Sequence, residues 1–65
     1  MKIVVMSYVS GIIDVIETDE RFDNEDDLHD FLEEKGYKLS ETSFMTFTSG
    51  TTVPVYKNDE LILEL

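Results

Sequence analysis

Residues 24–37, NEDDLHDFLEEKGY, contain the signals of one α-helix with both of its ends marked. Asn24 is a favourable N-cap, and the three acids after it fill the first turn, where carboxylates meet the positive end of the helix dipole. Gly36 suits the C′ position, and Tyr37 is placed to fold back onto the last turn, as in a Schellman cap. The apolar residues between the two ends recur at helical spacing and predict one narrow buried stripe: Leu28, Phe31 and Leu32.

Strand patterns precede and follow this helix. The β-branched and aromatic residues of 2–8 and 12–18 are separated by the turn-like sequence VSG, which predicts a first hairpin. Residues 43–48 and 51–56 are separated by Ser-Gly, and the same signal predicts a second hairpin there. No linker or low-complexity stretch divides the chain.

A third turn is predicted at Asn58 and Asp59, two residues that tolerate positive φ, so residues 60–65 are expected to return as a last strand. Pro54 cannot donate a hydrogen bond to a ladder and marks its strand as an edge or bulged strand. Residues 1–65 are therefore expected to form a single α+β domain in the order ββαβββ. Its sheet is mainly antiparallel, and the helix packs on one face of that sheet.

This order of elements is similar to the β-grasp, or ubiquitin-like, arrangement. The resemblance implies that the first strand and a late strand pair in parallel at the centre of the sheet. Covalent carriers of that family need a C-terminal Gly-Gly, whereas this sequence ends with Leu63, Glu64 and Leu65. A conjugation role is therefore disfavoured.

Composition limits the classes of partner. The chain has 65 residues, with 15 Asp and Glu against 5 Lys and Arg and a formal net charge of −10. Binding to nucleic acid or to an anionic membrane depends on Lys and Arg, so neither is an expected direct partner.

The remaining composition fits a folded cytoplasmic protein. There is no cysteine, which fits a reducing, cytoplasmic setting. The apolar content of 42% is enough for a folded core, and no stretch predicts a membrane span or signal peptide.

The acids are clustered, because eleven of the fifteen lie within residues 14–34. Capping explains those of the first helical turn. Later pairs on the helix are like charges at i,i+3 or i,i+4, and each costs roughly 0.2–0.5 kcal/mol. The expected partner-binding residues are the acids of the second strand, the following loop and the helix: Asp14, Glu17, Asp19, Glu20, Asp23, Asp26, Asp27, Asp30, Glu33 and Glu34.

The spacing of the helical acids suggests what they imitate. The four acids that matter here are Asp26, Asp30, Glu33 and Glu34. They extend over ~12 Å of helix, or roughly one charge per 3–4 Å, which is close to the ~3.4 Å axial spacing of charges along one DNA strand. A surface of this kind is attracted to the basic groove of a nucleic-acid-binding protein and competes for it.

In size, charge and layout, the chain resembles the small acidic inhibitors through which phages block host defence or DNA-binding proteins by mimicking nucleic acid. The resemblance implies a non-enzymatic, anti-defence inhibitor whose partner is a basic protein. Two other interpretations of the acids stay open. An acidic face is often only a solvated surface that keeps a protein soluble. Cation binding is disfavoured, because DNEDD at residues 23–27 lacks the spacing and the glycine of an EF-hand loop, so no metal or cofactor is expected.

Nothing in the sequence indicates an enzyme. His29 is the only histidine, and it is expected in solvent or at the margin of the helix's apolar stripe. No serine lies in a G-x-S-x-G context, and no glycine-rich run could hold a phosphate. A domain of this size rarely encloses the desolvated cleft that catalytic carboxylates need.

The strands suggest a second function. Their apolar residues fall on both faces of the expected sheet, as in the continuous run IVVM at residues 3–6. One helix with three core residues covers one face only. The other face is expected to bury itself against a protein partner or in a homodimer, unless the sheet twists over a single core. In this alternative the chain is an interaction module or subunit, and its acids only keep it soluble.

Overall fold

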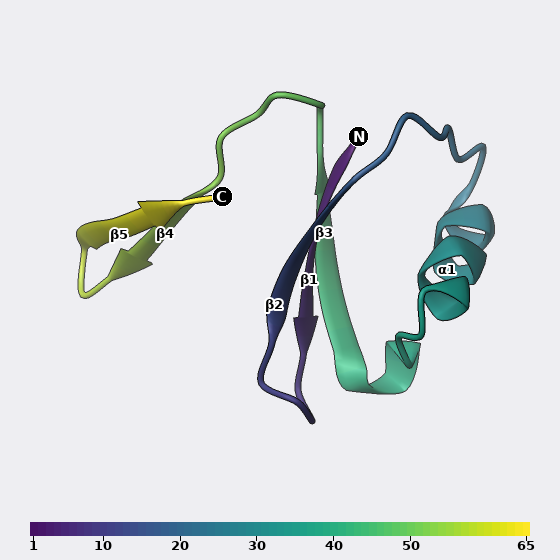
Figure 1. Cartoon of the computed structure of the whole chain (residues 1–65), viewed down its shortest axis with the longest axis horizontal. Coiled ribbons are helices and arrows are strands. Elements are labelled where there is room, and N and C mark those ends of the chain that lie inside the picture. The colour runs from purple at the N-terminus through teal and green to yellow at the C-terminus, as the bar shows by residue number, and fades with distance from the viewer.

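The computed structural model describes all 65 residues as two antiparallel sheets and one α-helix, which confirms the predicted α+β class. The elements are β1 (Lys2–Ser7), β2 (Ile13–Glu17), α1 (Glu25–Glu34), the 3₁₀ turn η1 (Leu39–Glu41), β3 (Thr42–Phe47), β4 (Pro54–Lys57) and β5 (Glu60–Glu64). One sheet has the strand order β2-β1-β3, and the other consists of β4 and β5. α1 lies on one side of the three-stranded sheet and the β4–β5 hairpin on the other (Figure 1).

β1 is the central strand because its residues are apolar on both faces. Ile3 and Val5 are completely buried in the core that includes α1, and Val4 is also buried. Val4 faces the opposite side, because side chains alternate along a strand. It lies opposite Val15 of β2 and Met45 of β3 in the two antiparallel ladders. A strand that is buried on both faces cannot leave its backbone N–H and C=O groups unpaired. It therefore needs a neighbouring strand on each edge, and β2 and β3 supply them.

The predicted second hairpin is wrong, because β3 pairs with β1 and not with the strand that follows it. The chain does turn after β3, since Thr51 N–H donates to Thr48 C=O at 3.1 Å and Gly50 has a φ of +82°. β1 nevertheless pairs with β3 over six residues, of which the central four are apolar, whereas β4 begins with Pro54, which has no N–H to donate. The predicted single sheet is therefore also wrong, because the strands form two separate sheets.

The parallel pairing implied by the β-grasp resemblance is also wrong, because β1 is antiparallel to both of its neighbours. The third turn is confirmed. Asn58 and Asp59 have φ values of +50° and +67° and connect β4 directly to β5. The register shifts between Val55 and Tyr56, which agrees with the edge or bulged strand predicted from Pro54.

Both predicted caps of α1 are present. The Asn24 side chain accepts a hydrogen bond of 2.9 Å from a backbone N–H of the first turn. At the other end, Tyr37 N–H donates to Leu32 C=O at 3.1 Å and Gly36 N–H donates to Glu33 C=O at 3.0 Å. These two bonds form a Schellman motif, which needs a left-handed residue at C′, and Gly36 supplies it with a φ of +99°. The helix ends are therefore fixed by local sequence.

The core between α1 and the sheet is small. It consists of Ile3, Val5, Leu28 and Leu32. Aromatic side chains close its margins, and the rings of Phe22 and Phe31 lie 5.1 Å apart. This core holds one side of α1 against the sheet and leaves the other side of the helix to solvent.

Candidate functional site

All ten acids predicted to bind a partner are exposed. A residue advances by about 100° around a helix, so Asp26, Asp30 and Glu33 lie on the side of α1 opposite the buried Leu28 and Leu32. Asp19, Glu20 and Asp23 lie in the loop before the helix, next to this side of it. Asp14 and Glu17 belong to β2, and Glu17 lies opposite Lys2 in the ladder, on the sheet face away from α1. The ten are Asp14, Glu17, Asp19, Glu20, Asp23, Asp26, Asp27, Asp30, Glu33 and Glu34.

Two of these ten acids, both on β2, have a partner within the chain. Asp14 accepts a hydrogen bond of 2.6 Å from the Tyr37 hydroxyl, and Glu17 Oε1 lies 3.7 Å from Lys2 Nζ. The side chains of the other eight make no ion pair and no hydrogen bond within the chain. These eight are named the acidic face below: Asp19, Glu20, Asp23, Asp26, Asp27, Asp30, Glu33 and Glu34.

The cations of the chain do not neutralise the acidic face. The Lys2–Glu17 pair is the only ion pair in the structure, and it involves a buried lysine on the central strand. Lys35 Nζ lies 5.2 Å from the centroid of the Phe31 ring and within reach of no carboxylate. Arg21 is surrounded in sequence by acids but also forms no ion pair. The carboxylates of the acidic face are therefore available to a cation from outside.

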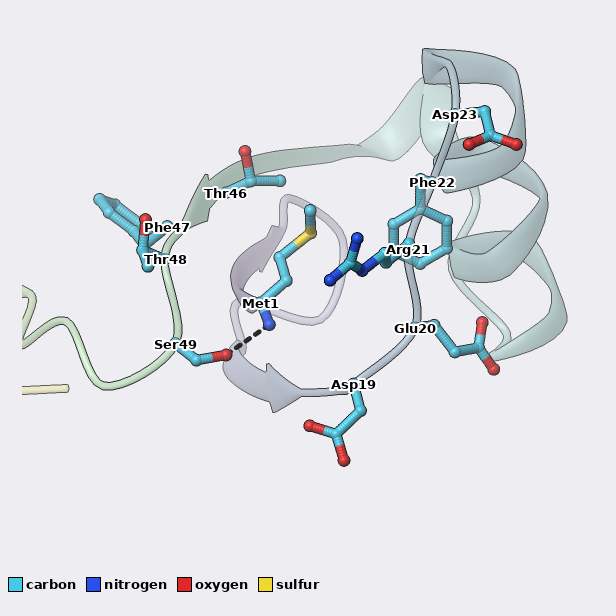
Figure 2. Close-up of a pocket in the computed structure, with 10 residues that line it drawn as sticks. All are labelled: Met1, Asp19, Glu20, Arg21, Phe22, Asp23, Thr46, Phe47, Thr48 and Ser49. Carbon is cyan, nitrogen blue, oxygen red and sulfur yellow. Dashed lines mark hydrogen bonds between the residues drawn. The ribbon is translucent and has the colours of Figure 1, made fainter.

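A depression of about 720 Å³ borders the acidic loop, and it is lined by Met1 and by residues 19–23 and 46–49. Figure 2 shows that Arg21 points toward Met1, whereas Asp19 and Glu20 point away from it. The depression therefore does not bring carboxylates face to face, as acid–base chemistry would need. The charge of the loop is presented outward, like that of the helix that follows it.

The Tyr37–Asp14 hydrogen bond ties the segment after α1 to β2. This bond, together with partial burial and the negative charge of Asp14, raises the pKa of Tyr37 to about 12. The folded state therefore favours the protonated hydroxyl. The contribution of this bond to stability is complete below the ordinary tyrosine pKa of 10.0 and is lost as the pH rises toward 12.

We expect Tyr37→Phe to lower the free energy of unfolding by about 1 kcal/mol at neutral pH, the usual value of one hydrogen bond. The difference between the two proteins should shrink between pH 10 and pH 12, because the wild type then loses the same bond. Urea titrations across this range measure it. Tyr56→Phe is the control, since Tyr56 is 61% exposed and its hydroxyl makes no hydrogen bond within the chain. A Tyr37→Phe difference that stays constant to pH 12 would show that Tyr37 does not stabilise the fold through its protonated hydroxyl.

Sequence reasoning did not find the role of Lys2. Its side chain is only 10% exposed, and Nζ donates to Thr51 C=O at 2.5 Å and to Leu65 C=O at 3.0 Å. These carbonyls lie on the two sides of the base of the β4–β5 hairpin. Lys2 therefore connects the hairpin to the three-stranded sheet. The one available signal was a lysine directly before the apolar run of residues 3–6, on the same strand face as Val4.

His29 lies at the margin of the buried stripe, as predicted. It is half-buried, and its ring meets that of Phe44 edge-on at 5.7 Å between centroids. No three His, Asp or Glu side chains are grouped so that they could hold a metal ion. The only α-helix, α1, is too short and too polar to cross a membrane.

Comparisons with known proteins give no relative for this chain. A scan against protein-family models, a search of curated proteins and a search of solved structures each find no match. The function is therefore argued from the surfaces of the chain alone.

Proposed function

We propose that the chain is a non-enzymatic binding protein whose acidic face occupies the basic groove of a nucleic-acid-binding protein in place of the nucleic acid. The observation that carries this proposal is the set of eight exposed carboxylates without a partner cation in the chain. Like charges held together destabilise the compact state. They become favourable when a complementary positive surface approaches. A phage-type anti-defence inhibitor is a role that such a protein fills.

The helical part of the acidic face is held rigidly, which favours binding. α1 is capped at both ends and is anchored by two buried leucines. Asp26, Asp30 and Glu33 therefore follow one side of a fixed helix at axial steps of about 6 and 4.5 Å, which lie between one and two of the ~3.4 Å phosphate steps of a DNA strand. A preorganised surface loses little conformational entropy when it binds.

A second candidate function rests on the sheet face away from α1. The open face, as we name it, consists of Met6, Ile13, Val15 and Met45, which are between 38% and 58% exposed. Exposed apolar side chains that are contiguous mark interaction surfaces. In this alternative the chain binds a protein through the open face, and the acids only keep the chain soluble.

Capture of partners from a host lysate with the tagged chain distinguishes the two functions. If the acidic face mimics nucleic acid, the captured protein should bind DNA or RNA, and added duplex should displace it. Its affinity should also fall at least about tenfold between about 50 and 300 mM NaCl, because surface charges are screened. A captured protein that is retained with excess duplex and at high salt would contradict the mimic and support the open face.

A further inference from the structure

We propose that two copies of this chain form a homodimer through the open face and the β4–β5 hairpin, on the side of the sheet away from α1. This interface is separate from the acidic face, so it stands or falls independently of the proposed nucleic-acid mimicry. It covers the open face that the second candidate function would use. It is carried by the exposed area of the chain, by the continuity of its apolar surface and by the placement of its charge.

The single chain exposes more surface than a compact monomer of its length. Its accessible surface is 4898 Å², whereas about 4,250 Å² is expected for a folded monomer of this size. Its radius of gyration is 12.6 Å, compared with about 10.8 Å for a compact chain of this length. The excess of about 650 Å² approaches the ~800 Å² that each partner contributes to a standard interface. The chain therefore carries about as much uncovered surface as one side of a dimer needs.

The residues of the open face are neighbours across the three strands. Val15 and Met45 lie on either side of Val4, and Met6 is paired with Ile13 one step further along the ladder. Residues opposite each other in a ladder share a face of the sheet. The four exposed side chains therefore form one apolar patch with the buried Val4 at its centre.

The β4–β5 hairpin lies on the same side of the sheet as the open face (Figure 1), and it carries further exposed apolar side chains. No residue of either strand is buried. A two-stranded hairpin is marginally stable in water by itself, and this one is held mainly at its base, by the Lys2 hydrogen bonds. Its large exposed apolar side chains are Tyr56, Leu61, Ile62 and Leu63.

The placement of charge favours a second copy as the occupant of this surface. Eleven of the fifteen acids lie within residues 14–34, and most of these belong to α1 and the loop before it, on the opposite side of the sheet (Figure 1). Two copies that meet through their open faces keep their acidic faces on the outside. The acids on the interface side are fewer: Glu17, which is paired with Lys2, and Asp59, Glu60 and Glu64 of the hairpin. A two-fold axis also matches the same apolar patch with itself. A second copy is available wherever the chain is synthesised, so the open face can be covered without another protein.

Sedimentation equilibrium of the full chain at micromolar concentration tests the dimer. We expect the wild type to have twice the mass of one chain. Met45→Lys puts a charge in the open face and should weaken self-association at least about tenfold, or 1.4 kcal/mol. Ser40→Lys is the matched control, because it adds the same charge at an exposed position on η1 and should remain dimeric. The association constant of the wild type should rise with added NaCl, since screening reduces repulsion between two chains of net charge −10.

A wild-type chain that stays monomeric over the whole concentration range would overturn the proposal. So would an unchanged association constant for Met45→Lys, or a wild-type constant that falls with salt, because a fall would mean that ion pairs, and not apolar contacts, hold the two copies together. Circular dichroism shows whether Met45→Lys is folded. If it is not, Leu63→Lys on the exposed hairpin takes its place, and the same two results decide.

Discussion

Leu32→Ala is expected to remove most of the stability of the chain. Leu32 has no exposed surface, and it is one of only four side chains that form the buried core. Truncation of a buried leucine to alanine costs about 2–5 kcal/mol, whereas a domain of this length has a total stability of roughly 3–10 kcal/mol. The helical signal in circular dichroism and the midpoint of a urea titration measure the loss.

The control for this variant is Val9→Ala, which truncates an apolar residue that is 74% exposed and lies outside the core. Its urea midpoint should stay close to that of the wild type. If Leu32→Ala kept the wild-type midpoint, α1 would not be anchored through this side chain. The acidic face would then have no rigid base.

Lys2→Met is expected to release the β4–β5 hairpin while α1 and the three-stranded sheet stay folded. Methionine keeps the apolar stem of the buried side chain but removes the donors to Thr51 C=O and Leu65 C=O. Thr51 C=O is left without a donor, which costs about 1–3 kcal/mol for a partly buried carbonyl, whereas Leu65 C=O keeps the N–H of Val53. The hairpin strands contain no buried residue, so little else within the single chain holds the hairpin in place.

Amide hydrogen exchange reports this release directly. Val53 and Leu65 bond to each other across the base of the hairpin, at 3.0 and 2.8 Å. We expect their exchange rates to rise at least about tenfold in Lys2→Met, which corresponds to 1.4 kcal/mol, with no comparable change in α1. Lys57→Met, at an exposed lysine that forms no ion pair, should leave both rates unchanged. Equal protection of Val53 in the wild type and Lys2→Met would show that the lysine does not hold the hairpin.

The features of this fold that could be predicted are local ones. Asn24 and Gly36 mark the ends of α1, and Asn58 and Asp59 mark a turn, because each signal acts within a few residues along the chain. The partner of β3 could not be found in this way. The turn after β3 is real, but the pairing was decided by the free edge of β1, about forty residues earlier in the sequence.

The features of the candidate site also divide into local ones, which could be predicted, and long-range ones, which could not. The predicted stripe of Leu28, Phe31 and Leu32 identified the covered side of α1, so the exposure of the helical acids on the other side could be predicted. Leu28 and Leu32 are buried, whereas Phe31 is partly buried at the margin of the core. The hydrogen bonds of Lys2 join it to carbonyls 49 and 63 residues away, and no local pattern signals contacts of that kind. The apolar excess on the second sheet face was visible in the strand sequence. The position of this face on the same side of the sheet as the β4–β5 hairpin depends on how the two sheets are placed, which no local pattern signals.

The central claim is that the acidic face binds the partner. It is tested most directly by the affinity of one triple variant for the captured nucleic-acid-binding partner: Asp30→Asn, Glu33→Gln, Glu34→Gln. Its matched control neutralises three acids of the hairpin, Asp59→Asn, Glu60→Gln, Glu64→Gln, and changes the net charge by the same amount. Both sets are exposed. The helical variant should melt at the same temperature as the wild type or a few degrees higher, because it removes repulsive i,i+3 and i,i+4 pairs worth roughly 0.2–0.5 kcal/mol each.

Titration calorimetry on the three proteins gives the decisive comparison. If the acidic face is the binding surface, the helical variant should bind at least about tenfold more weakly than the wild type, a loss of 1.4 kcal/mol, and the hairpin variant should bind about as well as the wild type. If the helical variant binds as tightly as the wild type, or if both variants lose affinity equally, the acidic face does not recognise the partner.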